Sequence, residues 1–173
     1  MDNYVKIANE YQRKFFGNIP HRLIFANLIC GLVSLLMSIS GFYRFSSLFI
    51  LLAGVCSYLN GKSYRQQHPK PETTNQFESF ADMTSFAVAP VILVHSLKNW
   101  SFLLIVAFIS FPFAGAYRIV KLNPKSTNDY VLGLPLPAAG IVVALLAFFS
   151  LVSPIIMIIL SLLMSTSLEI PKP

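Results

Sequence analysis

Four polar side chains stand where two long apolar runs of this chain end and begin. Ser57 and Asn60 are spaced i, i+3, and Glu78 and Asp82 are spaced i, i+4. Each spacing puts its pair on one face of a helix, so the two faces can meet. Oxygen ligands presented in this way hold hard divalent cations, which keep waters that a phosphate-bearing substrate can displace. The alternative is that Glu78 and Asp82 only favour the positive end of a helix.

The elements that must position these residues are apolar enough to span a membrane. Of the 173 residues, 55% are hydrophobic and only 12% are charged. With a mean hydropathy of +0.64, the chain is far more apolar than a soluble domain of its length. Three uncharged runs come close to the ~20 residues that a spanning helix needs: Leu23–Tyr43, Phe45–Gly61 and Trp100–Tyr117.

Two further apolar runs need a different interpretation. Met83–Leu97 is short and spans only if Glu78–Asp82 begins the same helix. Val131–Leu168 is too long for one span and fits two helices joined by a turn near residues 150–154. The sequence therefore predicts an all-α integral membrane protein with six transmembrane helices.

The N-terminal residues 1–20 are predicted to form an amphipathic helix at the membrane interface. Their apolar side chains are available to the lipid: Tyr4, Ile7, Tyr11, Phe15 and Phe16. A signal peptide fits less well, because mixed charges precede the first apolar run and that run is long. We expect residues 21–168 to form the six-helix domain and residues 169–173 a short C-terminal tail.

The charges of the predicted loops indicate an orientation. The net charge of +6 comes mainly from every second connection: Lys6, Arg13, Lys14 and Arg22, then Lys62, Arg65 and Lys70, then Arg118, Lys121 and Lys125. The alternate connections contain only Arg44 and Lys98. Because basic loops stay on the cytoplasmic side, we expect a multi-pass protein of the cell membrane with both termini and residues 62–70 cytoplasmic. Basic clusters beside apolar runs argue against binding of nucleic acid.

The segment around the four polar residues resembles the signature of the CDP-alcohol phosphatidyltransferases. In that family Asp-x2-Asp-Gly-x2-Ala-Arg is followed by Gly-x3-Asp-x3-Asp. Here SYLNGKSYR begins at Ser57, and after eight more residues Thr74 begins the second half. Further segments are most similar to the bacterial phosphatidylserine synthases of the family: IPHRLIFANLICG, SFADMTSFAVAP, AYRIVKLN and GLPLPAAG.

This resemblance implies an activity and a site. Members transfer a phosphatidyl group from CDP-diacylglycerol to an alcohol such as serine, with two Mg²⁺ or Mn²⁺ ions on four acidic residues. The last acid, here Asp82, is the expected general base. Glu78 replaces the third acid, and neutral Asn60 and Ser57 replace two others. Losing these charges is expected to leave low or no transferase activity.

Other residues receive roles from the resemblance. Gly61, Arg65, Arg118 and Lys121 are candidates for substrate binding, although anchoring at the membrane face equally explains Arg118 and Lys121. A homodimer is also implied, and close helix contact is permitted by small residues such as Gly31, Ala53 and Gly54. Membrane lipids are the other expected partners.

Three functions remain open from the sequence. The retained frame favours a transferase, and the lost carboxylates favour an inactive paralogue that binds lipid or an active partner. A transporter is disfavoured, because no ionisable residues cross the apolar runs. Cys30 and Cys56 are expected to be core residues without a disulfide. His95 is expected to be a structural or interfacial residue away from the site.

Overall fold

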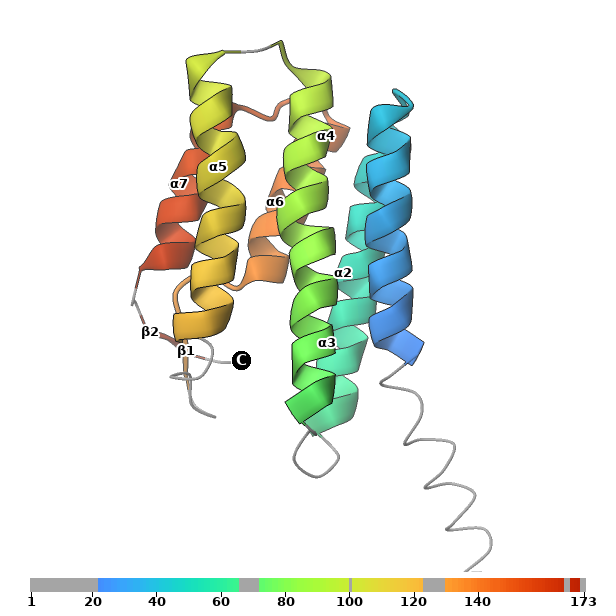
Figure 1. Ribbon diagram of the computed structural model, residues 1–173, viewed down its shortest axis with the longest axis vertical. Helices are drawn as coiled ribbons and strands as arrows, with labels where there is room; N and C mark the ends of the chain where they lie inside the picture. Colours follow the sequence, from blue (N-terminus) through green and yellow to red (C-terminus); the bar gives the residue numbers. More distant parts are fainter. Residues whose placement is uncertain (1–21, 66–71, 100, 123–129, 167–168, 172–173) are drawn as a thin grey trace, which may run out of the picture.

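The computed structural model describes residues 22–65, 72–99, 101–122, 130–166 and 169–171. The predicted amphipathic helix at residues 1–20 lies outside this part of the chain. The described part is almost entirely helical (Figure 1), and its helices are Arg22–Ile39, α2 (Tyr43–Arg65), α3 (Glu72–Met83), η1 (Thr84–Val88), α4 (Ala89–Leu97), α5 (Phe102–Tyr117), η2 (Arg118–Leu122), α6 (Leu136–Phe148) and α7 (Pro154–Ser165). Two short strands, β1 (Tyr130–Leu132) and β2 (Glu169–Pro171), pair antiparallel.

Four helical segments are long and apolar enough to cross a membrane: Arg22–Ile39, Tyr43–Ser63, Thr73–Leu97 and Phe102–Lys121. The third is the continuous run of α3, η1 and α4, so the polar turn before Met83 does begin the same helix, as its span required. The predicted pair near the C-terminus is present as α6 and α7, joined by residues 149–153. Their 13 and 12 residues reach only about 20 Å, less than the apolar core of a bilayer.

Tight turns join neighbouring helices because single residues accept a left-handed backbone. Gly41 has a φ of 83° between Arg22–Ile39 and α2, and Ser150 has a φ of 59° between α6 and α7. Glycine adopts this conformation without a steric penalty. Pro154 then stands in the first turn of α7, and Pro137 in that of α6, where a missing N–H is tolerated. These turns make consecutive helices antiparallel.

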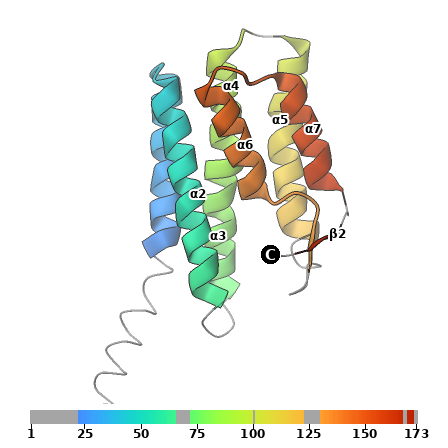
Figure 2. The same cartoon turned by 180° about the vertical axis from the view of Figure 1, so that it is seen from behind.

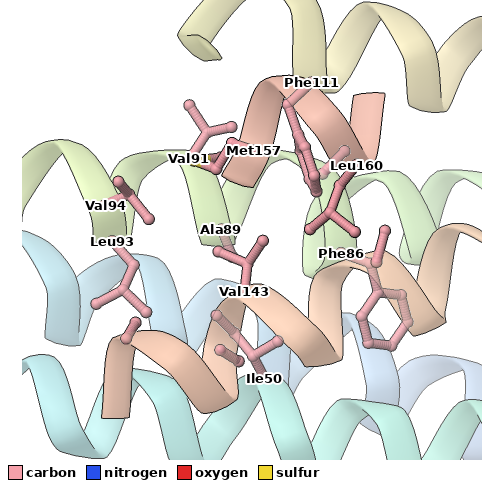
Figure 3. Packing of buried hydrophobic residues seen from close by; sticks show 14 of the residues in the cluster. Ile50, Phe86, Ala89, Val91, Leu93, Val94, Phe111, Val143, Met157 and Leu160 are labelled. Carbon is pink, nitrogen blue, oxygen red and sulfur yellow. The ribbon is translucent and has the colours of Figure 1, made fainter. Parts of the chain in front are cut away.

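The helices pack into a bundle in which α2 lies along α6 and α5 lies along α7 (Figure 2). The chain Thr73–Leu97 passes through its centre, and η1 contacts both α2 and α6. Figure 3 shows buried side chains of this segment among those of the neighbouring helices, with Ala89 close to Val143 and Ile50. The ends of α2 and α5 and the start of α3 lie at the same end of the bundle as β1 and β2 (Figure 1).

The outer faces of the helices are apolar as well. Exposed side chains recur every three or four residues along Arg22–Ile39: Phe25, Ile29, Leu32, Leu36 and Ile39. α5 has a similar exposed row, including Ile105, Ile109 and Phe113. A helix that is apolar on its buried and its exposed face is typical of a lipid environment. The described structure therefore agrees with the prediction of a membrane protein.

Glycine at position 140 permits the closest approach between α6 and η1. A Cβ atom added there would lie 2.8 Å from the Cα atom and the main-chain oxygen of Phe86. Since these are backbone atoms, rotation of a side chain cannot relieve the overlap.

We expect Gly140→Ala to lower the free energy of unfolding by about 1–3 kcal/mol, because the helices must separate. Gly61→Ala is the matched control, since no atom lies within 4 Å of its added Cβ, and its effect should stay within about 1 kcal/mol in either direction. Unfolding by titration with a denaturing detergent measures both. Equal effects of the two substitutions would contradict the packing described here.

Candidate functional site

The four polar residues singled out in the sequence meet between α2 and α3. Ser57 donates a hydrogen bond from its hydroxyl to Asp82 Oδ1 at 3.3 Å, and Asn60 Nδ2 donates to Glu78 Oε1 at 3.0 Å. The two helices run in opposite directions. The earlier residue on α2, Ser57, therefore pairs with the later residue on α3, Asp82, and Asn60 pairs with the residue one turn before Asp82. The structure therefore brings the two predicted faces together, one pair on each turn.

A fifth residue, Asn27, reaches the site from a third helix, Arg22–Ile39. Its Nδ2 donates to Asp82 Oδ1 at 2.8 Å, a shorter bond than the one from Ser57. Asn27 is not among the site residues predicted from the sequence. A signal for it was present, because it is a lone amide inside an apolar run, and buried polar residues in spanning helices are commonly functional.

The turn that follows Asp82 is a π-helix, and it helps to hold Asn27. Ser85 in η1 donates its hydroxyl hydrogen bond to the main-chain oxygen of Asn27 at 2.9 Å. Short π-helical segments frequently occur at functional sites, because the extra residue per turn redirects the side chains around it. Asp82 and Ser85 thus both face the helix Arg22–Ile39, although α-helical spacing alone does not predict η1.

The amide side chains of the site are more deeply buried than its carboxylates. Asn27 is 2% exposed and Asn60 1%, whereas Glu78 and Asp82 are partly exposed. Both amides donate to a carboxylate, yet their Oδ1 atoms have no hydrogen-bond partner within the described part of the chain. A buried acceptor without a partner costs about 1–3 kcal/mol. Two such acceptors beside two carboxylates mark a site suited to a further positive or hydrogen-bond-donating group.

The oxygen atoms of the site between α2 and α3 suit a hard cation as ligands. They are oxygens of carboxylates, amides and a hydroxyl, which Mg²⁺ and Mn²⁺ accept as ligands. Within the described residues, no group of three or more His, Cys, Asp and Glu side chains is assembled. Glu78 and Asp82 together provide two negative charges. This charge equals in magnitude that of one divalent cation.

The remaining candidate residues lie at the same end of the bundle in different environments. Gly61 follows Asn60 on α2 and has open space where a side chain would be. Arg118 is 3% exposed, while Lys121 is exposed. Both belong to η2, whose first residue lies one turn beyond Gly115 of α5. Arg65 is the last residue of α2, and its side chain lies outside the described part.

Gly115 places Arg118 relative to the site. A Cβ atom at Gly115 would lie 3.4 Å from the Met83 sulfur, so α5 passes close to the residue after Asp82. Arg118 is therefore at the level of the site on a neighbouring helix. Arg118 thus places a buried positive charge at the level of the site.

The other polar residues weighed in the sequence lie apart from the site. His95 in α4 makes an edge-on contact with the ring of Phe108, with the ring centroids 6.0 Å apart. This fits its expected structural role near the opposite end of the bundle. Cys30 and Cys56 are both free, and no disulfide joins them.

The fold and the site together are those of an α-helical membrane protein with a polar, oxygen-rich site at one end of its bundle. No family model matches the chain. The CDP-diacylglycerol–serine O-phosphatidyltransferase of Bacillus subtilis (strain 168) is 28% identical over 160 residues, which cover 88% of this chain and 89% of the relative. The archaetidylserine synthase of Methanothermobacter thermautotrophicus is 28% identical, with 96% of this chain and 75% of the relative covered.

A third relative gives the same result. The CDP-diacylglycerol–serine O-phosphatidyltransferase of Methanocaldococcus jannaschii is 28% identical over 84% of this chain and 70% of its own length. The resemblance to the CDP-alcohol phosphatidyltransferase family is thereby confirmed over most of the chain.

Proposed function

We propose that this chain is a phosphatidylserine synthase-like enzyme, which transfers a phosphatidyl group from CDP-diacylglycerol to serine. The observation that carries the proposal is the meeting of the two halves of the motif around Asp82. The proposed substrates are those in the names of the relatives. They favour a transferase over the inactive paralogue that the lost carboxylates suggested.

The proposed reaction is a displacement at phosphorus. The serine hydroxyl oxygen forms a bond to the phosphorus that carries diacylglycerol, and the bond from that phosphorus to the oxygen of CMP breaks. The hydroxyl proton passes to the carboxylate of Asp82, which acts as general base. In the structure, Asn27 and Ser57 donate hydrogen bonds to Oδ1 of this carboxylate. A bound divalent cation, Mg²⁺ or Mn²⁺, would neutralise charge on the diphosphate.

The substrate phosphates require positive charge and open space near the carboxylates. Arg118, which is buried at the end of α5, and Lys121, which is exposed, are proposed to bind the phosphate or the serine carboxylate. Arg65 is proposed to bind phosphate from the end of α2. The open face at Gly61 lets a substrate approach α2 closely.

The proposed rate is low. A site with four aspartates would provide twice the negative charge that Glu78 and Asp82 provide here. We therefore propose turnover below about one per second, the lower end of the ordinary range for enzymes. Ser57 and Asn60 reduce the rate in this proposal without removing the base.

Analysis of the lipid product tests the proposed function. The purified protein in vesicles of CDP-diacylglycerol, with Mn²⁺ and isotope-labelled serine, should form labelled phosphatidylserine detectable by mass spectrometry. Glycerol, inositol and glycerol phosphate are offered in parallel as competing acceptors. Incorporation of one of these in place of serine would reassign the acceptor, and incorporation of none would refute the transferase.

The arrangement in the membrane is also a proposal. We propose six spans within residues 21–168 in the cell membrane. Both termini and the loop after α2 are proposed to lie in the cytoplasm. The basic loops support the orientation. α6 and α7 are short, and tight packing against α2 and α5 supports their insertion beside longer helices. The segment 1–20 would lie on the cytoplasmic surface.

Thiol labelling in intact cells should follow this orientation. In a background of Cys30→Ala and Cys56→Ala, single cysteines at Lys70 and Lys125 should be protected from a membrane-impermeant reagent. A cysteine at Arg44 should react, because that turn faces the outside. Permeabilised cells, in which all three should react, are the control. Labelling at Lys70 but not at Arg44 would reverse the orientation.

A homodimer is proposed from the family resemblance alone. Gly31, Ala53 and Gly54 were expected to permit close contact between two copies. The structure uses them inside one chain, because Gly31 meets Ser85 and Gly54 meets Ile141, while Ala53 is fully buried. A second copy would have to use another surface.

A further inference from the structure

Asn27 is anchored on both sides in a way that a residue merely filling space is not. Its side chain donates to Asp82, and its main-chain oxygen accepts the hydroxyl of Ser85. With 2% of its surface exposed, it is enclosed by protein. Three elements, the helix Arg22–Ile39, α3 and η1, are therefore joined at this one residue.

Within the described part of the chain, only one of the two polar atoms of the Asn27 carboxamide is hydrogen-bonded. Nδ2 has its acceptor, but Oδ1 has no partner in the described part of the chain. Asn60 repeats this arrangement one turn away, with Nδ2 on Glu78 and an unpartnered Oδ1. A half-turn of a carboxamide about its last side-chain bond exchanges the donor and the acceptor with little change in shape.

Such a half-turn would be unfavourable unless a cation arrived. After it, Asn27 Oδ1 would face the carboxylate of Asp82, where two partial or full negative charges repel each other. A divalent cation between them changes this repulsion into two favourable contacts and replaces the hydrogen bond that the turn removes. Ser57 already points its hydroxyl at the same Asp82 oxygen and can contribute a third oxygen.

We infer that the site binds a single divalent cation between three helices and that Asn27 becomes one of its ligands when its carboxamide turns. Asp82 is the central ligand, and Ser57 completes the group. Glu78, which accepts a hydrogen bond from Asn60, supplies the second negative charge one turn away. This inference rests on the proposed function in one respect: the function suggests that the ligand is a divalent cation.

The test measures binding of Mn²⁺ itself, without substrate. The full chain in lipid nanodiscs is titrated with Mn²⁺, and electron paramagnetic resonance counts the free ion. Wild type should bind one ion per chain. Asn27→Asp should tighten the dissociation constant by about ten-fold or more, because a charged oxygen replaces a neutral one. Asn27→Leu should remove measurable binding.

Thermal unfolding with Mn²⁺ or with a chelator separates ligation from simple hydrogen bonding. Asn27→Asp should unfold at a lower temperature than wild type in chelator, because two carboxylates then face each other. Mn²⁺ should raise its unfolding temperature by more than that of wild type. This comparison also covers the case in which Asn27→Leu does not fold. Ser34→Ala is the control, since Ser34 is buried on the same helix in a distant cluster with Ser46, and its Mn²⁺ affinity should equal that of wild type.

Three results would overturn the inference. They are two ions bound per chain, no gain in affinity in Asn27→Asp, and an equal Mn²⁺-induced rise for wild type and Asn27→Asp. The result is distinguishable from that of the proposed function. One ion that depends on Asn27, without transfer to serine, supports the inference and refutes the function. Transfer to serine without this dependence does the reverse.

Discussion

Asp82→Asn should reduce the release of CMP from CDP-diacylglycerol by about 10²–10⁴-fold, the usual effect of removing a general base. The amide keeps the size of the carboxylate but cannot take the proton of the serine hydroxyl. It also removes the charge on which Asn27 and Ser57 converge. Release of CMP by the purified variant, with serine and Mn²⁺ at saturation, measures the loss.

A matched control separates this chemistry from a general loss of charge. Asp129→Asn makes the same substitution at a position that lies outside the motif in the sequence, so CMP release should stay within about two-fold of wild type. A folded Asp82→Asn protein that keeps its activity would show that Asp82 is not the base. Elution as a single species in size-exclusion chromatography confirms the folded state.

The combined change Ser57→Asp, Asn60→Asp and Glu78→Asp should tighten Mn²⁺ binding by more than the three single changes suggest. Ligands from two helices act on the same ions, so their effects are coupled. We expect an extra factor of about ten, a coupling of about 1.4 kcal/mol, beyond the product of the single effects. The number of bound ions should rise from one to two, because the negative charge of the site doubles.

The single variants and a fourth substitution complete this series. Tyr64 stands where relatives with the full motif have alanine, so Tyr64→Ala is added to the triple variant to make room for the substrate. Faster CMP release in the triple or quadruple variant would follow from the tighter metal site. Mn²⁺ binding that is purely additive would show that the three substituted positions do not share their ions.

The sequence was sufficient to predict the pairing of α2 with α3. Its basis was spacing: Ser57 with Asn60 and Glu78 with Asp82 each fit one helical face, and the hydrogen bonds between them confirm that the faces meet. The continuous helix through Met83 also followed from the length that a span requires. Both features depend on local periodicity, which a sequence displays directly.

Features that depend on packing were not predicted. η1 contains an extra residue per turn, and its Phe86 lies against Gly140 of α6, a contact that local spacing does not display. Asn27 lies 55 positions from Asp82, so no spacing rule connects the two residues. α6 and α7 are shorter than their apolar run suggested, because hydropathy marks a lipid-compatible segment without marking where its helix ends.

We propose above all that a site with two carboxylates in place of four still supports transfer of a phosphatidyl group to serine. The most direct measurement is CMP release by the wild-type protein in CDP-diacylglycerol vesicles, with and without serine, in Mn²⁺ and after chelation. We expect slow CMP release, below about one per second, that requires both serine and the divalent cation. No release with both present, or equal release after chelation, would contradict it.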